Sequence, residues 1–217
     1  MITNPTLTNK TVEQICSESV PLPVVETFHS IQGEGASTGV NAFFIRLGGC
    51  DVGCPWCDTK QSWNPEHHPQ RSVVELTQEA LAAMPAIVVI TGGEPLMHDL
   101  NPLTLSLHAA GLRVHLETSG AYPLSGYFDW ITLSPKRFKP PLASIYPHAS
   151  ELKIVVVKSN DLEWAEQQAA KVSEQTLKYL QPEWKSHLSS QALIFKYILQ
   201  HPEWRMSLQT HKFLQVR

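Results

Sequence analysis

The sequence predicts an α/β fold, an incomplete β/α barrel with a parallel sheet. Strand-like and helical segments alternate along the 217 residues, which favours a parallel sheet with helices outside it. We count about six or seven such strands, whereas a complete eightfold barrel typically takes about 250 residues. Residues 1–22 are polar and end at two prolines. We therefore expect a loose N-terminal lead-in over 1–22 and a single domain over 23–217.

The first half of the chain supplies two strands and two helices. Aromatic and branched residues mark the first strand as buried, and a short apolar run marks the second as covered on both faces. Ser72 and Glu75 form a capping-box pattern at the start of the first helix. Gly111 is placed to end the second helix. The expected elements are a strand over 41–47, a helix over 73–84, a strand over 86–91 and a helix over 100–110.

The second half continues the alternation with weaker patterns. A long amphipathic helix is expected from Asp161, which is a plausible N-cap. Residues 135–147 contain four prolines and read as a loop. The expected elements are strands over 113–118, 129–134 and 152–157, a helix over 161–178, a short strand over 178–181, a helix over 190–200 and a last strand over 212–216.

Composition and charge exclude several classes of protein. No apolar run approaches the roughly 20 residues that a membrane helix needs, so no membrane association is expected. The first twenty residues do not read as a signal peptide, which favours a cytoplasmic location. The net charge is −3, and no run of Lys or Arg stands out. A broad nucleic-acid-binding face is therefore not indicated.

The cysteines point to a metal site. Cys16 stands alone and is interpreted as structural, whereas Cys50, Cys54 and Cys57 lie within eight residues of one another on a glycine-rich segment. Closely spaced thiolates select zinc or an iron–sulfur centre. A structural zinc ion needs four ligands, and the nearest further candidates are His67 and His68. Three cysteines on a 4Fe–4S cluster instead leave one iron free to bind a small molecule.

Polar motifs follow the predicted strands one after another. The carboxyl ends of parallel strands meet at one edge of a sheet, where ligands bind. All these motifs are therefore expected on the same rim. They are Gly48–Cys57, Gly92-Gly93-Glu94-Pro95, Glu117-Thr118-Ser119-Gly120, Ser134-Pro135-Lys136 and Gln181-Pro182.

The spacing C-x3-C-x2-C, with Trp56 before the last cysteine, resembles the radical S-adenosylmethionine (SAM) superfamily. Thr91-Gly92-Gly93-Glu94-Pro95 resembles that family's GGEP-type motif, in which glycines permit close backbone approach to SAM. The resemblance implies a radical SAM core fold and a 4Fe–4S cluster whose open iron binds SAM. An electron from the cluster then releases a 5′-deoxyadenosyl radical, so the cofactor supplies the reactive chemistry.

A longer series of motifs narrows the resemblance. Phe28-His29-Ser30-Ile31-Gln32-Gly33-Glu34-Gly35 precedes Arg46 and the cysteines, and Cys57-Asp58-Thr59 follows. From about residue 22 to the C-terminus the chain resembles the 7-carboxy-7-deazaguanine synthase family. The resemblance implies a carbon–nitrogen lyase that turns 6-carboxy-5,6,7,8-tetrahydropterin into 7-carboxy-7-deazaguanine with loss of ammonia, on the route to queuosine and other deazapurines. Hydrogen abstraction at C6 of the pterin would start the ring contraction.

The same resemblance implies a role for each matching residue. Cys50, Cys54 and Cys57 would hold the cluster and Thr59 a magnesium ion, and no catalytic side chain is expected beyond the cofactor-derived radical. The SAM contacts would be Trp56, Cys57, Asp58, Gly93, Glu117, Ser134, Pro135, Lys136, Gln181, Pro182, Glu183 and Trp184. The substrate contacts would be Ile31, Gln32, Gly33, Arg46, Thr91 and the terminal carboxylate of Arg217.

Residue chemistry agrees with three of these roles. Arg46 can hold a carboxylate in a bidentate fork, and Gln32 offers a donor and an acceptor to a guanine-like edge. The Thr59 hydroxyl is a hard oxygen ligand, which suits magnesium. Two structural alternatives stay open at this point: Arg46 as a salt-bridged residue, and Thr59 as a turn hydroxyl.

Two other functions stay open beside this one. A glycyl-radical activating enzyme uses the same cysteine spacing, but it would not need the residues around Gln32 and Arg46 or a metal ligand at Thr59. A zinc-binding module without enzymatic activity is the second alternative. The expected partners are a small pterin substrate, an unidentified electron donor that is flavodoxin-like or similar, and a second copy of the chain in a homodimer.

Overall fold

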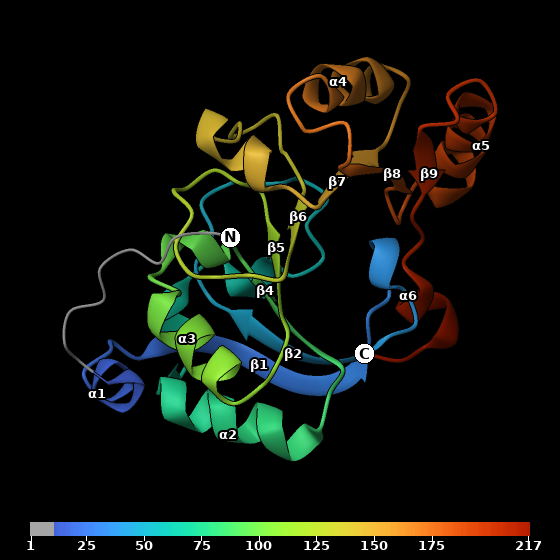
Figure 1. Ribbon diagram of the computed structural model, residues 1–217. Coiled ribbons are helices and arrows are strands. Elements are labelled where there is room, and N and C mark those ends of the chain that lie inside the picture. Colours follow the sequence, from blue (N-terminus) through green and yellow to red (C-terminus); the bar gives the residue numbers. More distant parts are fainter. Residues whose placement is uncertain (1–10) are drawn as a thin grey trace.

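The computed structural model describes residues 11–217, which form one nine-stranded sheet with helices packed against it (Figure 1). The strands are β1 Leu22–Ile31, β2 Asn41–Leu47, β3 Gln70–Arg71, β4 Ile87–Gly92, β5 Val114–Thr118, β6 Trp130–Leu133, β7 Glu151–Val156, β8 Leu177–Pro182 and β9 Trp204–Met206. The α-helices are α1 Val12–Ser17, α2 Val73–Ala83, α3 Asn101–Ala109, α4 Asn160–Ala169, α5 His187–Ile198 and α6 Thr210–Leu214. Short 3-10 helices are η1 Gly35–Ser37, η2 Lys60–Ser62, η3 Pro65–His67, η4 Pro95–Met97 and η5 Ala143–His148.

The predicted incomplete barrel is confirmed. The sheet has the order β3-β1-β2-β4-β5-β6-β7-β8-β9, and every pair from β2 to β9 is parallel. β1 pairs antiparallel with β2, and β3 pairs antiparallel with β1. β3 and β9 are the two edges, so the sheet stays open. All the parallel strands therefore present their carboxyl ends at one rim.

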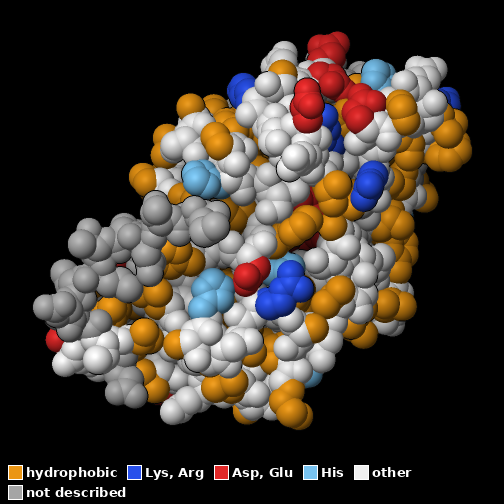
Figure 2. Space-filling view, viewed as in Figure 1, with side chains coloured by type: hydrophobic (Ala, Val, Ile, Leu, Met, Phe, Trp, Pro, Cys, Tyr) orange, Lys and Arg blue, Asp and Glu red, His pale blue; other side chains and the backbone are white. Residues whose placement is uncertain are grey.

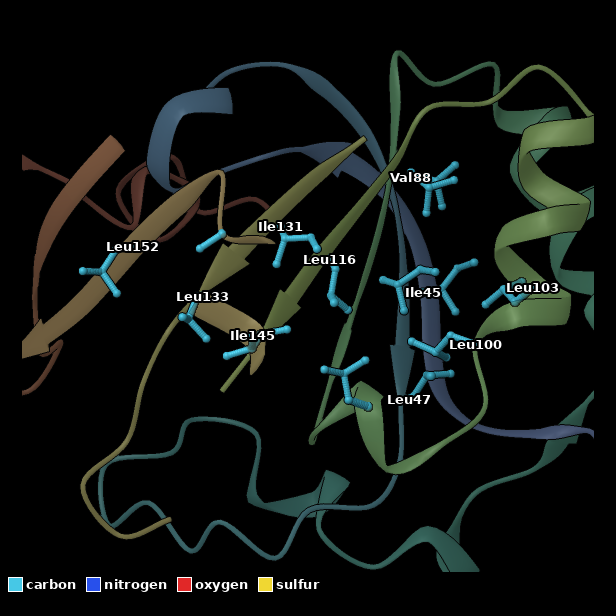
Figure 3. Close-up of a cluster of buried hydrophobic side chains, with 14 of the residues drawn as sticks. Ile45, Leu47, Val88, Leu100, Leu103, Leu116, Ile131, Leu133, Ile145 and Leu152 are labelled. Atoms are coloured by element: carbon cyan, nitrogen blue, oxygen red, sulfur yellow. The ribbon is translucent and has the colours of Figure 1, made fainter. Parts of the chain in front are cut away.

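The core lies mainly between the sheet and the helices around it (Figure 3). Ile45 and Leu47 of β2 and Leu100 and Leu103 at α3 are fully buried there. The other face of the same strands carries a second cluster that includes Phe44 and Val89. Burial on both faces explains why the sequence of β4 is a continuous apolar run rather than an alternating one.

Local sequence patterns account for the helix ends. Ser72 caps α2, and the Ser72 and Glu75 side chains make both reciprocal bonds of the predicted capping box. Gly111 follows α3 with φ +79°, a conformation that glycine adopts without strain. Among the described residues, no helix is both long enough and apolar enough to cross a membrane.

The N-terminal expectation was partly wrong. Residues 1–10 lie outside the described part, but 12–17 form the short helix α1, with a capping box between Thr11 and Gln14. Cys16 is buried in the core, which agrees with a structural role. The sequence pattern also missed β1, which begins at Leu22 inside the expected lead-in. Glu26, Thr27, His29 and Ser30 interrupt the apolar pattern that a core strand would show.

The C-terminal third departs further from expectation. α4 ends at Ala169 rather than near 178, and Asp161 does not cap it: its carboxylate accepts hydrogen bonds from the backbone N–H groups of Val157 and Lys158, at 2.9 and 3.0 Å. The predicted last strand over 212–216 is wrong, because residues 210–214 form α6. The last strand is instead β9, which lay outside the predicted elements and pairs with β8.

Hydrophobic side chains gather along the edge of the molecule formed by α5 and α6 (Figure 2). Leu188, Phe195 and Leu199 of the α5 region are 76%, 56% and 69% exposed. Their spacing puts them on one face of the helix. Phe213 and Leu214 of α6 are also exposed.

Candidate active site

One cavity of about 370 Å³ opens at the carboxyl ends of the strands, where the motifs were predicted to meet. It is lined by all of the predicted site residues except Pro135, which is buried beside it without lining it. Residues from the ends of β1, β2, β4, β5, β6, β7 and β8 contribute to its wall. The arrangement of the sheet thus brings together segments that are far apart in the chain.

The loop that carries the cysteines packs directly on the glycine pair after β4. The N–H of Gly93 donates to the carbonyl of Leu47 at 2.9 Å, and the N–H of Glu94 donates to the carbonyl of Gly49 at 2.8 Å. A Cβ atom on Gly93 would lie 2.2 Å from the Gly49 oxygen, so no side chain fits. Glycine at this position lets the turn approach the cysteine loop closely.

The three thiols of this loop face the same cavity. Cys50, Cys54 and Cys57 are free and partly buried. Burial raises the pKa of Cys50 and of Cys54 above the usual value of a thiol. A bound metal centre would reverse this effect, because a coordinating thiol is deprotonated. The donor set therefore fits a thiolate-bound metal centre with a further position open to the cavity.

The spacing of the thiols does not favour the zinc alternative. Zinc–sulfur bonds of about 2.3 Å would hold thiolates about 3.8 Å apart. Within the described residues, the only three ligand atoms that all lie within 4.8 Å of one another belong to Glu166, His201 and Glu203, not to the cysteines. The candidate fourth ligands bond elsewhere: the His68 ring contacts the carbonyl of Gln61, and the His67 ring contacts Asn64.

Glu94 links the turn after β4 to the end of β5. Its side chain is 1% exposed and accepts four hydrogen bonds. Thr118 Oγ1 donates at 2.6 Å, Ser119 donates from its N–H at 2.8 Å and from Oγ at 2.5 Å, and the N–H of Leu96 donates at 3.0 Å. All four donors are neutral. The GGEP and ETSG segments of the sequence are therefore joined through this one buried carboxylate.

A second buried cluster surrounds Lys153 of β7, a residue that the sequence analysis did not select. Its ammonium contacts Glu34 at 2.5 Å and Glu117 at 2.8 Å. Burial by itself would lower the pKa of Lys153. The neighbouring carboxylates of Glu117, Glu34 and Glu151 raise that pKa by more than burial lowers it, so the amine stays charged. One feature of the sequence indicated this cluster. Lys153 stands in the apolar strand LKIVVV, and a buried lysine is rarely found without a partner.

The carboxylates around Lys153 differ in their protonation. Burial raises the pKa of Glu34, but Lys153 lowers it more, to about 2. Burial raises the pKa of Glu117, and it raises that of Glu151 to about 7. Gln32 donates to Glu117 at 3.3 Å, so its amide is already engaged with the wall of the pocket. The cluster places one fixed cation among three carboxylates beside the cavity.

Arg46 lies in the pocket and in a salt bridge at the same time. Its Nε atom contacts Glu26 Oε1 at 2.9 Å, and the other oxygen of Glu26 contacts the guanidinium of Arg217. Both guanidinium groups lie near the ring of Phe28, whose centroid is 5.8 Å from Cζ of Arg46 and 5.4 Å from Cζ of Arg217. Arg46 therefore forms the salt bridge of the structural alternative and also lines the cavity, where it can contact a ligand.

The remaining predicted residues complete the wall. Thr59 precedes η2 without a capping bond from its side chain, and its hydroxyl lies 3.6 Å from the Cys57 sulfur. Lys136 donates to the carbonyl and the hydroxyl of Ser134, and burial lowers the pKa of its amine. Glu183 accepts from the N–H groups of Lys185 and Ser186, so it shapes the turn after β8.

The segment after β9 lines the pocket, although the sequence analysis identified no motif in it. Gln209, His211 and Lys212 line the cavity together with Arg217. The carbonyl of Gly33 accepts from the N–H and the hydroxyl of Thr210, at 2.9 and 3.0 Å. A Cβ atom on Gly33 would lie 2.1 Å from the ring of His211. The C-terminal end of the chain therefore closes one side of the site.

Comparison with known proteins gives a consistent picture. Residues 44–158 match the model of the radical SAM superfamily. The chain is 61% identical over 199 residues to a 7-carboxy-7-deazaguanine synthase from Synechocystis sp., which covers 92% of this chain and 95% of that protein. It is 34% identical over 221 residues to a 7-carboxy-7-deazaguanine synthase from Escherichia coli, covering 89% of this chain and 98% of that protein.

A solved structure shows the same architecture. The crystal structure of QueE from Escherichia coli superposes with a TM-score of 0.78 and 31% sequence identity, covering 93% of this chain and 99% of that one. The likeness therefore covers most of the chain, beyond residues 44–158.

Proposed function

Because the chain belongs to the 7-carboxy-7-deazaguanine synthase family of the radical SAM superfamily, it is a radical SAM lyase, and we propose that it converts 6-carboxy-5,6,7,8-tetrahydropterin into 7-carboxy-7-deazaguanine with loss of ammonia. This step lies on the route to queuosine and related deazapurines. The glycyl-radical activating enzyme and the zinc module are not favoured by these relatives.

One observation supports the proposal above all. Three thiols, a guanidinium and a buried ammonium paired with two carboxylates meet at one cavity. The thiols suit a metal cluster, and the charged groups suit a small polar substrate that carries a carboxylate. An activating enzyme would need an open path for a protein segment instead.

Family membership implies a 4Fe–4S cluster and SAM. We assign the cluster to Cys50, Cys54 and Cys57, and SAM bound to it supplies a 5′-deoxyadenosyl radical when the cluster is reduced. The residues proposed to hold SAM come from four segments of the rim: Trp56–Asp58, Gly93 with Glu117, Ser134 with Lys136, and Gln181–Trp184. Pro135 does not line the cavity and would act only by fixing its neighbours.

Magnesium is proposed at Thr59. The hydroxyl makes no capping bond, so it is available to a hard cation. Magnesium usually keeps several water ligands and takes few from the protein, which a single threonine beside a substrate carboxylate satisfies. The ion would fix the carboxylate of the pterin next to the cysteine loop.

The substrate is proposed to lie between β1, β2 and the Lys153 cluster. Glu26 engages Nε of Arg46, which orients the two terminal nitrogens as a fork for a carboxylate. Ile31, Gln32, Gly33 and Thr91 line the same side of the cavity. Glu34 and Glu117 offer carboxylate acceptors to the N–H groups of a pterin ring, and Lys153 keeps both oriented. The end of the chain is held there too, because Ser30 donates to the terminal carbonyl oxygen of Arg217.

The partners and location follow from the same features. We propose an external one-electron donor, flavodoxin-like or similar, since the cysteine loop reaches the surface at Asp51 and Gly53. We propose a homodimer, which the exposed apolar face of α5 supports. Four free cysteines and an oxygen-sensitive cluster suit the reducing cytoplasm.

An anaerobic assay tests the function directly. Reconstituted protein is incubated with the carboxypterin, SAM, a chemical reductant and magnesium, and the product is detected by mass. We expect a brown protein that forms 7-carboxy-7-deazaguanine and 5′-deoxyadenosine, with slower turnover when magnesium is omitted. The Cys57→Ala variant is expected to lose both products. SAM cleavage without any deazaguanine product would refute the substrate assignment, and a colourless zinc protein would refute the whole proposal.

A further inference from the structure

The segment 207–212, which runs from the end of β9 into the first residues of α6, touches both sides of the cavity. Figure 1 shows α6 and the C-terminus beside the end of β1. Two separate chains of hydrogen bonds run through this segment. Each starts at the loop 33–36 after β1 and ends at the residues proposed to hold SAM.

The first chain runs through Ser207, which is 3% exposed. Its hydroxyl accepts from the N–H of Gly35 at 2.9 Å and donates to Oε1 of Gln181 at 2.9 Å. The N–H of Ser207 donates to the carbonyl of Leu180 at 3.0 Å, which fixes its position against β8. The Ser207 hydroxyl thus donates to Gln181, which is proposed to hold SAM, and accepts from the loop that follows β1 on the pterin side.

The second chain runs through Gln209 and Lys212. Gln209 Nε2 donates to Glu34 at 2.8 Å, and Lys212 Nζ donates to Oε1 of the same glutamine at 2.9 Å. Lys212 also contacts Asp58, directly after the last cysteine, at 2.7 Å. Its ammonium lies 5.1 Å from the ring centroid of Trp184. A single lysine therefore joins the loop 33–36 to two segments of the SAM side.

We propose that the segment 207–212 couples the SAM site to the pterin site, with Ser207 and Lys212 as positioning residues. The inference rests on the proposed function, because that function assigns the two sides of the cavity to the two ligands. Neither residue needs to touch a ligand. Ser207 holds Gln181 against the loop that carries Gly33 and Glu34, and Lys212 holds Asp58 against Gln209, the partner of Glu34.

The expected coupling is positive. A ligand that binds first orders the groups it touches, and the two chains of hydrogen bonds extend this order to the opposite side. The second ligand then loses less conformational freedom on binding. Couplings of this kind typically change an affinity by about 5- to 150-fold, and the effect is the same in both directions.

Binding measurements on the holoenzyme test the inference. The cluster is reconstituted anaerobically and left oxidised, so that SAM binds without being cleaved. The dissociation constant of SAM is measured by calorimetry in magnesium buffer, without and with saturating 6-carboxy-5,6,7,8-tetrahydropterin. We expect the pterin to tighten SAM binding about 10-fold in the unmodified protein. The Ser207→Ala and Lys212→Met variants should each reduce this ratio to about threefold, and the double variant should bring it close to one.

Two matched variants serve as controls. Ser106→Ala removes a hydroxyl that accepts a hydrogen bond from Thr77 away from the cavity, and Lys196→Met removes an exposed lysine of α5. Both should keep the full ratio. Lys212 is charged and partly exposed, so its variant is informative even if the buried Ser207→Ala protein does not fold.

The outcomes separate coupling from simple structural support. A variant that weakens SAM equally with and without the pterin, or a ratio of one in the unmodified protein, would overturn the inference. These results leave the proposed function untouched if the unmodified protein still makes 7-carboxy-7-deazaguanine. Absence of that product would instead overturn the proposed function.

Discussion

Two buried carboxylate clusters lie at the same rim of the sheet, yet they are built from different partners. Glu94 accepts four hydrogen bonds from hydroxyl and backbone donors, with no cation in contact. Glu34 and Glu117 instead share the ammonium of Lys153, and Glu151 lies next to them. The first cluster is held by neutral dipoles and the second by charge.

The difference shows how one rim can combine rigidity with reactivity. Every donor around Glu94 comes from a residue directly beside it on η4 or at the end of β5, so the cluster joins two backbone segments. The Lys153 cluster lies beside the cavity and has three carboxylates for one ammonium. Its net charge therefore depends on pH and on the bound ligand. We therefore expect substitutions in the first cluster to change mainly stability, and substitutions in the second to change both stability and turnover.

The largest effect is expected for Lys153→Met. Removing the cation leaves Glu34 and Glu117 buried without compensation, which typically costs about 3–5 kcal/mol. Urea unfolding of the cluster-free protein measures this loss, and the anaerobic assay should show no product. Lys196→Met, on the exposed face of α5, is the control and should change stability by less than about 0.5 kcal/mol. A Lys153→Met protein as stable as the control would show that charge does not hold this cluster.

Glu151→Gln should stabilise the protein increasingly as pH rises. The pKa of Glu151 is about 7 in the folded protein, above its ordinary value of 4.5, so the folded state holds the proton more tightly. The stability from that proton is complete below pH 4.5 and is lost as pH rises through 7. Between pH 4.5 and 7.5 the variant should therefore gain roughly 3 kcal/mol relative to the unmodified protein.

Unfolding curves of both proteins at these two pH values measure that difference. The amide keeps an oxygen that accepts from the N–H of Ala36, a contact of 2.9 Å in the unmodified protein. An equal stability difference at both pH values would show that Glu151 titrates normally. Loss of stability at pH 7.5 alone would show that the charged carboxylate is required.

Glu94→Gln should cost about 2 kcal/mol, because an amide offers only one acceptor oxygen where the carboxylate has two. Two donors then face an NH2 group, and the backbone N–H among them, that of Leu96 or of Ser119, stays unsatisfied. Denaturant unfolding at constant pH measures the loss, with the exposed Glu203→Gln as control.

Thr118→Val should have the smallest effect, about 1 kcal/mol. The substitution keeps the shape of the side chain but removes the donor to Glu94 and the acceptor for the N–H of Gly120, at 2.9 Å. Glu94 keeps its three other donors. A loss larger than that of Glu94→Gln would mean that Thr118, rather than the carboxylate, holds the two segments together.

Sequence patterns alone predicted the parallel sheet, the rim and the cysteine site. β2, α2 and β4 follow from hydrophobic periodicity and the capping box at Ser72, which act over a few residues. The cysteine spacing and the glycines at 92 and 93 are equally local. Because parallel strands align their carboxyl ends, local predictions were enough to place distant motifs at one edge.

Only the tertiary structure identified Lys153 and Lys212 as parts of the site. Lys153 meets Glu34 across 119 positions of the chain, and Lys212 meets Asp58 across 154. No short-range pattern encodes such pairs, because the geometry arises when the sheet curves and the segment after β9 folds back. The sequence by itself predicted β2, the strands β4 to β8 and the three thiols to which we assign the cluster. Tertiary packing decided which charged side chains surround the substrate, since a buried charge is stable only where a distant partner compensates it.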